Sequence, residues 1–307
     1  MSCCDPGFSG PIDVVFTWVD GFDEEWRKSQ DHWREKEGLS KGDTKRDPTP
    51  NLLKDELYFS LHQVLNFMPW VRNIFIFTQT PQRPKWLSDD PKYSKVKVVH
   101  HEDVFQPYAP LPSFNGLLNY SQIHHIPGLS EHFILFDDDF FVGKSLSRSF
   151  FFDSAGHPVY KLEFPFICWL TPQAEYSKIM INTDSLTRKM FGHFMFRINH
   201  LPIPLRKQDC LDVEQKLIRR GIFQKGNVPR FRNPNKTIEY PFLVANYAMS
   251  KRETRRTLPS LKTKYIGKRT HSKIKKLFRR HDIPHFFCVN QDFDQQMSNM
   301  FQKRFNF

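Results

Sequence analysis

Three consecutive carboxylates, Asp137, Asp138 and Asp139, are the residues of this 307-residue sequence best suited to metal-dependent chemistry. They follow the apolar run 133–136 and precede a second apolar run that ends at Gly143. Clustered carboxylates repel one another, and Mg²⁺ relieves that repulsion by accepting one or two carboxylates together with substrate phosphate oxygens. A solvated acidic turn after a core strand is the alternative. The apolar residues on both sides favour a metal site that uses two of the three side chains.

The elements around this triplet predict an α/β fold with a mostly parallel sheet and flanking helices. The apolar run before the triplet is typical of a buried strand. Strand patterns also occur at 11–21, 73–78 and 95–100, and a helical pattern lies at 55–67. Ligands in such sheets bind outside the carboxyl ends of the strands. Asp20, at the end of the first run, occupies the same kind of position as the triplet, although a lone Asp-Gly pair is more often only a turn.

Two histidine pairs, His100-His101 and His124-His125, raise a zinc hypothesis. Neither pair has a histidine four residues further on or a Cys-x-x-Cys partner, which are the spaced ligand sets that zinc sites normally use. Hydrogen bonding to a substrate, or packing within a helix, is therefore the preferred interpretation.

Composition predicts a soluble chain that forms one large α/β domain or two smaller ones. Hydrophobic residues make up 39% of the sequence, mean hydropathy is −0.56, and no run approaches the ~20 apolar residues of a membrane span. No signal peptide is visible at the N-terminus. The five cysteines are scattered and odd in number, which favours reduced thiols in a cytoplasmic protein. A removed N-terminal segment would place the chain in the secretory pathway instead.

The whole net charge of +12 comes from residues 251–280, which contain thirteen Lys/Arg and one acid. Such a segment predicts an anionic partner: membrane lipid, a polyanionic glycan or nucleic acid. Nucleic acid is the weakest of these because only two aromatic residues are present for stacking. Ile274, Leu277 and Phe278 form one apolar stripe among the cations, the pattern of a helix lying on an anionic surface. A core-facing helix with a solvated cationic side has the same pattern.

A series of motifs, in order along nearly the whole chain, resembles the Stealth family of hexose-1-phosphate transferases, which includes bacterial capsule polymerases. The motifs are Asp13-Val-Val-Phe-Thr-Trp-Val-Asp-Gly21, Asp55-Glu-Leu57, Met68-Pro-Trp-Val-Arg-Asn-Ile74, Leu111-Pro-Ser-Phe-Asn115, Ile126-Pro-Gly-Leu-Ser-Glu-His-Phe-Ile134 with the Asp138-Asp139 pair, Asn199-His-Leu-Pro-Ile-Pro204, the stretch around Arg232, and Phe287-Cys-Val-Asn290. The first five of these blocks, in order, already make a chance match improbable.

The resemblance implies a Rossmann-like (GT-A-like) nucleotide-sugar transferase core. Its activity would be transfer of a sugar-1-phosphate from a UDP-sugar to a glycan hydroxyl, with formation of a phosphodiester and release of UMP. Mg²⁺ (or Mn²⁺) would bind Asp138 and Asp139, with Asp138 and Asp20 also counted as catalytic. His200, held rigidly by the prolines that follow it, would be the base, and Arg232 would bind phosphate. The remaining substrate-binding positions that it implies are Asn115, Lys207, Asn290 and Asp292.

Several positions depart from the pattern of the family. Asp137 stands where an asparagine precedes the Asp pair, Tyr58 and His62 stand where arginines are usual, and Gln79 replaces an aspartate. Gln291 also replaces an aspartate, which its neighbour Asp292 could supply. Fewer cationic groups near Tyr58 and His62 would alter donor specificity.

The organisation expected is a transferase core at 1–250, a basic helical interaction segment at 251–284, and a C-terminal strand and tail at 285–307 that return to the core. Two other functions compete with sugar-phosphate transfer. An ordinary glycosyltransferase would use the same Asp pair but release UDP, and a catalytically degenerate module would bind a glycan without turnover.

Overall fold

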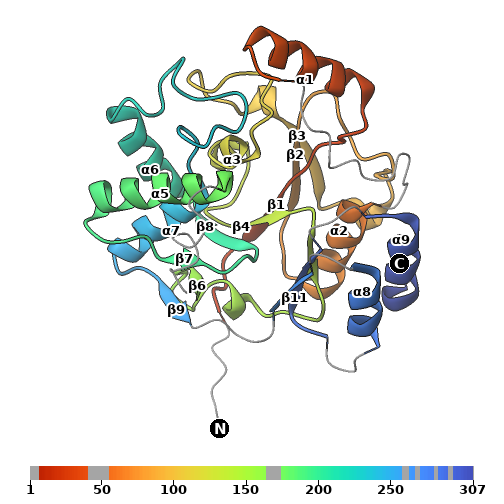
Figure 1. The fold of residues 1–307 in the computed structure, drawn as a ribbon. Helices are drawn as coiled ribbons and strands as arrows, with labels where there is room; N and C mark the ends of the chain where they lie inside the picture. The colour runs from red at the N-terminus through yellow and green to blue at the C-terminus, as the bar shows by residue number, and fades with distance from the viewer. Residues whose placement is uncertain are drawn as a thin grey trace.

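The structure is a computed structural model that describes residues 7–40, 55–163, 174–257, 263–266, 270–279, 283–289 and 293–306. Its centre is a five-stranded sheet in the order β3-β2-β1-β4-β8 (Figure 1). The strands are β1 (Ile12–Thr17), β2 (Ile74–Thr78), β3 (Val96–His100), β4 (His132–Asp137) and β8 (Ile203–Arg206). The first four are parallel, and β8 runs antiparallel to β4. The predicted α/β fold with a mostly parallel sheet is confirmed, and it is compatible with a Rossmann-like core.

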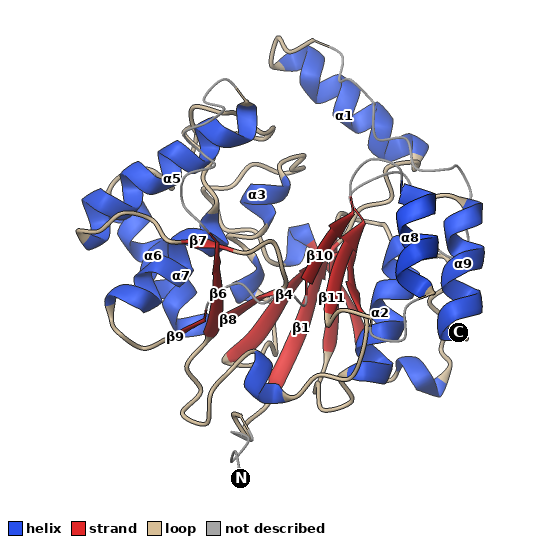
Figure 2. Cartoon of the chain, turned by 60° about the horizontal axis from the view of Figure 1, so that its bottom comes forward, coloured by secondary structure: helices blue, strands red, loops and turns tan. Residues whose placement is uncertain are grey.

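Helices cover both faces of this sheet, which explains its nearly continuous apolar strands. Val15, Phe75 and Phe133 belong to the cluster formed with α6 (Lys207–Arg219) and α7 (Tyr240–Ser250). The next residues along two of the strands, Phe16 and Ile134, belong to the cluster formed with α2 (Glu56–Phe67). Because successive strand residues point to opposite faces, one set of strands supplies two cores. Figure 2 shows α5 (Glu175–Phe191), α6 and α7 on one side of the sheet and α2 on the other.

Two small sheets flank the central one. The first has the order β7-β6-β9 and the second the order β10-β11-β5. Their strands are β5 (Phe140–Val142), β6 (Val159–Glu163), β7 (Arg197–Ile198), β9 (Arg255–Thr257), β10 (Thr263–Ile266) and β11 (Phe286–Val289). The other helices are α1 (Glu24–Lys36), α3 (Gly116–Asn119), α8 (Thr270–Phe278) and α9 (Gln295–Phe305). None of the described helices is long and apolar enough to cross a membrane.

The basic segment differs from its sequence-based prediction. It is not one helix, because β9 and β10 precede α8. β9 pairs with β6, and β10 pairs with β11. Ile274 and Leu277 are fully buried, and the Phe278 ring packs against Phe287 and Phe301. The apolar stripe of α8 therefore faces the protein core, so of the two interpretations of this pattern the structure selects the core-facing helix with a solvated cationic side over the helix that lays its stripe on an anionic surface. The cations of α8 remain on its exposed side.

Candidate active site

The Asp triplet lies where β4 leaves the sheet. Asp137 is the last residue of β4, and Asp138 and Asp139 form the tight turn into β5. The Asp137 carboxylate accepts hydrogen bonds from the Tyr120 hydroxyl at 2.6 Å and from the Thr17 hydroxyl at 3.3 Å. Because the turn begins at Asp138, the side chains of Asp138 and Asp139 need not point to opposite faces as successive residues of a strand do.

Two further aspartates gather at the same edge of the sheet. Asp20 follows β1, and its Oδ1 accepts a hydrogen bond from the Phe22 N–H at 2.9 Å. The Gln82 side chain fixes the Asp20 backbone through bonds of 2.9 and 3.0 Å. Asp55 caps α2 by accepting from the Tyr58 N–H at 2.8 Å. Burial, together with the charge of Asp20, raises the pKa of Asp55 to about 6.

These carboxyl groups act on one another electrostatically. Burial raises the pKa of Asp138 well above its usual range, and the charges of Asp139, Asp137 and Asp55 raise it in that order. Ionising the whole group therefore needs a compensating positive charge. Carboxylate oxygens are the hard donors that Mg²⁺ or Mn²⁺ prefers. The residues present fit a divalent cation on Asp138 and Asp139.

His200 and Cys288 complete one side of this cluster. A ring nitrogen of His200, the Cys288 sulfur and an Asp139 carboxylate oxygen all lie within 4.8 Å of one another. The thiol donates to Asp139 Oδ2 at 3.2 Å, and the exposed His200 ring lies 4.8 Å from the Phe140 ring. Burial, together with the Asp139 charge, raises the pKa of Cys288, so its sulfur keeps the proton that it donates. The pairing of Ile203 with Leu135 brings the preceding residues, including His200, to the end of β4.

Glu239, which the sequence did not single out, lies on another side of the cluster. It is 5% exposed and precedes α7. Burial raises the pKa of Glu239 to about 8, and the charge of Asp137 adds to this, whereas Arg232 and a hydrogen bond from Tyr176 oppose it. A glutamate at the start of a helix normally indicates a favourable interaction with the helix dipole. Here the Glu239 side chain makes no capping bond, so that local signal would have concealed its position at the site.

The loop that carries exposed Arg232 is braced by Asn115 and Arg230. Asn115 is 1% exposed, and its amide nitrogen donates to the Pro229 carbonyl at 3.2 Å and to Thr237 Oγ1 at 3.4 Å. The Arg230 guanidinium lies 3.6 Å from the centre of the Trp33 ring on α1. Asn115 thus holds the loop, and its direct binding of substrate stays a prediction.

Several sequence-predicted positions lie elsewhere. Lys207 follows β8, and its N–H donates to the Glu131 carbonyl at 2.8 Å, beside the start of β4. Because its neighbour Arg206 pairs with His132, Lys207 lies about 17 Å of strand away from the carboxylates. The structure therefore does not bring it to the site. Asn290, Gln291 and Asp292 lie outside the described residues.

The positions that depart from the family pattern have packing partners. Gln79 is buried and accepts a hydrogen bond from the Trp26 indole at 3.1 Å. His62 is a buried residue of α2. Its Nδ1 lies 2.7 Å from the Tyr58 carbonyl oxygen, and its Nε2 lies 3.1 Å from the Tyr93 hydroxyl. Where arginines are usual in the family, this chain therefore has Tyr58 and His62, which belong to a cluster of packed aromatic side chains.

The two histidine pairs are separate from the carboxylate cluster. His101 stacks on Phe105, and burial lowers the pKa of His101 to about 3. His124 Nε2 lies 3.2 Å from Glu214, and His125 Nε2 lies 2.9 and 3.0 Å from its two oxygens. These distances describe hydrogen bonds, and the ligand atoms of the three side chains also lie within 4.8 Å of one another, close enough to hold a metal ion. The zinc alternative for His124-His125 therefore stays open beside the packing interpretation. His125 and Glu214 also line a cavity of about 480 Å³.

The fold and this constellation define an α/β enzyme whose site lies at the carboxyl edge of its sheet. Comparison with known proteins is more specific. The family model of Stealth protein conserved region 1 matches residues 10–37, and that of conserved region 2 matches residues 52–160. The chain belongs to the Stealth family and is a phosphotransferase.

Relatives match over most of the chain. It is 31% identical to the capsular polysaccharide phosphotransferase fcs1 of Haemophilus influenzae, over 96% of this chain and 82% of that protein. It is also 31% identical to the exopolysaccharide phosphotransferase CpsY of Mycobacterium tuberculosis, over 91% of this chain but 52% of that protein. The capsular polysaccharide phosphotransferase cps1A of Actinobacillus pleuropneumoniae is 42% identical over 47% of this chain and 39% of its own length.

Proposed function

We propose that this enzyme transfers a sugar-1-phosphate from a UDP-sugar to a hydroxyl of a polysaccharide and releases UMP. The observation that carries the proposal is the placement of His200 beside Asp139 at the carboxylate cluster. The names of the relatives, capsular and exopolysaccharide phosphotransferases, support the acceptor class. A GT-A-like nucleotide-sugar core is part of the same proposal.

In the proposed reaction, the acceptor hydroxyl attacks the sugar-bearing phosphorus of the donor. A new oxygen–phosphorus bond forms, the diphosphate oxygen–phosphorus bond breaks, and UMP leaves with that bridging oxygen. His200 takes the hydroxyl proton on a ring nitrogen, which is the general-base role that an imidazole most often has in enzymes. The exposure of His200 leaves room for a polymeric acceptor.

The other residues bind and neutralise the donor. Asp138 and Asp139 would hold Mg²⁺ or Mn²⁺, which when bound supplies positive charge to the diphosphate and the leaving phosphate. Arg232 contributes a bidentate phosphate contact from the loop braced by Asn115. Asp20 lies at the same edge of the sheet and accepts hydrogen bonds from hydroxyl groups of the nucleotide or sugar.

The test is incubation with a panel of UDP-sugars, Mg²⁺ and a glycan acceptor, followed by chromatographic separation of UMP from UDP. We expect UMP and a phosphate-containing glycan. Release of UDP would instead identify an ordinary glycosyltransferase, and binding without either product would identify a glycan-binding module.

An anionic membrane contact through residues 251–280 is a further part of the proposal. Its support is purely electrostatic, because Lys273, Lys275, Lys276 and Arg279 project from α8 while its apolar stripe is buried. Each cation near an anionic surface adds about 1 kcal/mol. We expect sedimentation with anionic but not neutral liposomes and loss of it at high salt. Equal sedimentation after replacing these four residues with glutamine would exclude this face.

A further inference from the structure

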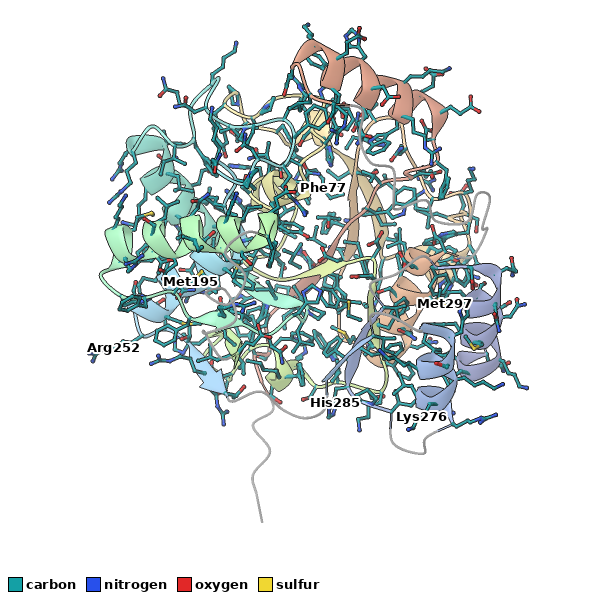
Figure 3. The ribbon with its side chains drawn as sticks, viewed as in Figure 1. Phe77, Met195, Arg252, Lys276, His285 and Met297 are labelled. Atoms are coloured by element: carbon teal, nitrogen blue, oxygen red, sulfur yellow. The ribbon has the colours of Figure 1, made fainter. Side chains whose placement is uncertain are left out.

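The segment 193–197 presents aromatic side chains to solvent from a tightly held backbone. Phe194 is 67% exposed and Phe196 is 37% exposed. Met195, which lies between them and is labelled in Figure 3, is 6% exposed. The Met195 N–H donates to buried Asp184 at 2.8 Å. Completely buried Asn246 accepts from the Phe196 N–H at 2.8 Å and donates to its carbonyl at 3.0 Å. The phenylalanines are thus fixed in outward-facing positions.

Arginines accompany both rings. The Arg188 guanidinium lies 5.2 Å from the centre of the Phe194 ring, and the Arg256 guanidinium lies 5.3 Å from that of Phe196. Arg188 also pairs with Asp184 at 3.0 Å, which ties it to the residue that fixes the Met195 backbone. We call Phe194, Phe196, Arg188 and Arg256 the aromatic–arginine face. Two exposed rings with two guanidinium groups combine an apolar platform with positive charge.

This face leads directly into the candidate active site. Phe196 precedes His200 by four residues, and β7 lies between them. A chain of that length spans at most about 14 Å, which is the upper limit for the separation of the Phe196 and His200 backbones, and both side chains are exposed. A polymer that follows this segment from His200 would therefore reach the face within a few sugar units.

We propose that the aromatic–arginine face is an acceptor subsite for a glycan that already carries phosphodiesters. The apolar C–H face of a pyranose packs on a phenylalanine ring, because that contact removes apolar surface of both from water. The guanidinium fork matches the two free oxygens of a phosphodiester. A neutral glycan would use the rings alone. The inference rests on the proposed function in one respect: the product of one transfer becomes the preferred acceptor of the next.

Binding is tested without turnover. The probe is a mannan oligosaccharide that contains mannose phosphodiester links, compared with a mannan oligosaccharide of the same number of sugars that contains glycosidic links only, by calorimetry at low salt. We expect the wild-type protein to bind the phosphorylated form at least 10-fold more tightly. The variants F194A/F196A and R188Q/R256Q should each weaken that binding at least 10-fold, and R256Q alone, which leaves the Arg188–Asp184 pair intact, should weaken it measurably.

Matched controls lie on α6. Ile218 is 38% exposed and Arg219 is also exposed, so I218A and R219Q remove comparable groups outside the face. They should bind like wild type. Equal binding of the two oligosaccharides by the wild-type protein, or wild-type binding by both double variants, would overturn the proposal.

UMP release with a monosaccharide glycoside as acceptor is measured in parallel, and the face variants should retain it. UMP release without phosphate-dependent glycan binding refutes the subsite alone. The expected binding pattern without UMP release from any donor refutes the proposed function and leaves the face as a binding surface.

Discussion

Replacing Asp13 with alanine should destabilise the protein strongly, although Asp13 is remote from the site. Its side chain is completely buried at the start of β1. It accepts hydrogen bonds from Arg72 at 2.6 and 2.9 Å, from the Asn73 N–H at 3.0 Å, and from the Ser130 N–H at 2.7 Å. One carboxylate therefore ties together the segments that lead into three adjacent strands.

The magnitude follows from what the substitution leaves behind. Breaking a buried ion pair costs about 3–5 kcal/mol, and each buried N–H without a partner costs about 1–3 kcal/mol. Arg72 lowers the total because its side chain is 42% exposed and can turn to water. We expect Asp13→Ala to lower the free energy of unfolding by about 3–5 kcal/mol, and Arg72→Ala by less.

Urea unfolding followed by circular dichroism measures both values. Asp89→Ala is the matched control, because Asp89 is exposed, and its effect should stay within about 0.5 kcal/mol. At about 2 °C per kcal/mol, Asp13→Ala should also lower Tm by several degrees. An unfolding free energy for Asp13→Ala within 1 kcal/mol of wild type, on the scale of typical surface substitutions, would refute the reasoning.

Three further predictions concern the site. Chelation should abolish turnover, and Asp139→Asn should remove metal-dependent donor binding measured by calorimetry; full activity in excess chelator would exclude the cation site. His200→Ala should slow transfer by about 10²–10⁴-fold while donor affinity is retained, whereas Arg232→Ala should weaken donor binding; wild-type turnover of the histidine variant would assign the base elsewhere. Glu239 has a raised pKa of about 8 in the folded state, so the folded protein holds more protons than the unfolded chain between its usual pKa and pH 8, and stability falls as pH rises through that window. Urea titrations at pH 4 and pH 9 should therefore show that the free energy of unfolding of Glu239→Gln, relative to that of wild type, is higher at pH 9 than at pH 4. The expected change is about 1.4 kcal/mol for each pH unit between the pKa of Glu239 in the unfolded chain and its pKa in the folded protein. A relative stability that is the same at both pH values would contradict this.

The amino-acid sequence alone can locate a site residue when two conditions hold. A local pattern must mark the strand that the residue follows, and a topological rule must say at which edge of the sheet that strand ends. Apolar strands predict a parallel sheet, and the carboxyl ends of parallel strands share one edge. That rule places Asp20 beside the Asp triplet, and in the structure Asp55 interacts electrostatically with both Asp20 and Asp138. It also explains why one motif has two roles: Asp13 begins β1 and stabilises the opposite edge, whereas Asp20 follows β1 at the site.

What the sequence by itself determined is therefore the α/β class, the family and the core of the candidate site, because strand pattern and motif residues are local properties. The tertiary structure alone decided the rest. The direction of β8 brought His200 to the site and carried Lys207 to the far edge. Packing against Phe287 and Phe301 decided that α8 turns its apolar stripe inward, since a core and a membrane select the same pattern. Glu239 and Cys288 reach the carboxylates from distant segments of the chain. No local sequence pattern encodes which distant side chains pack together.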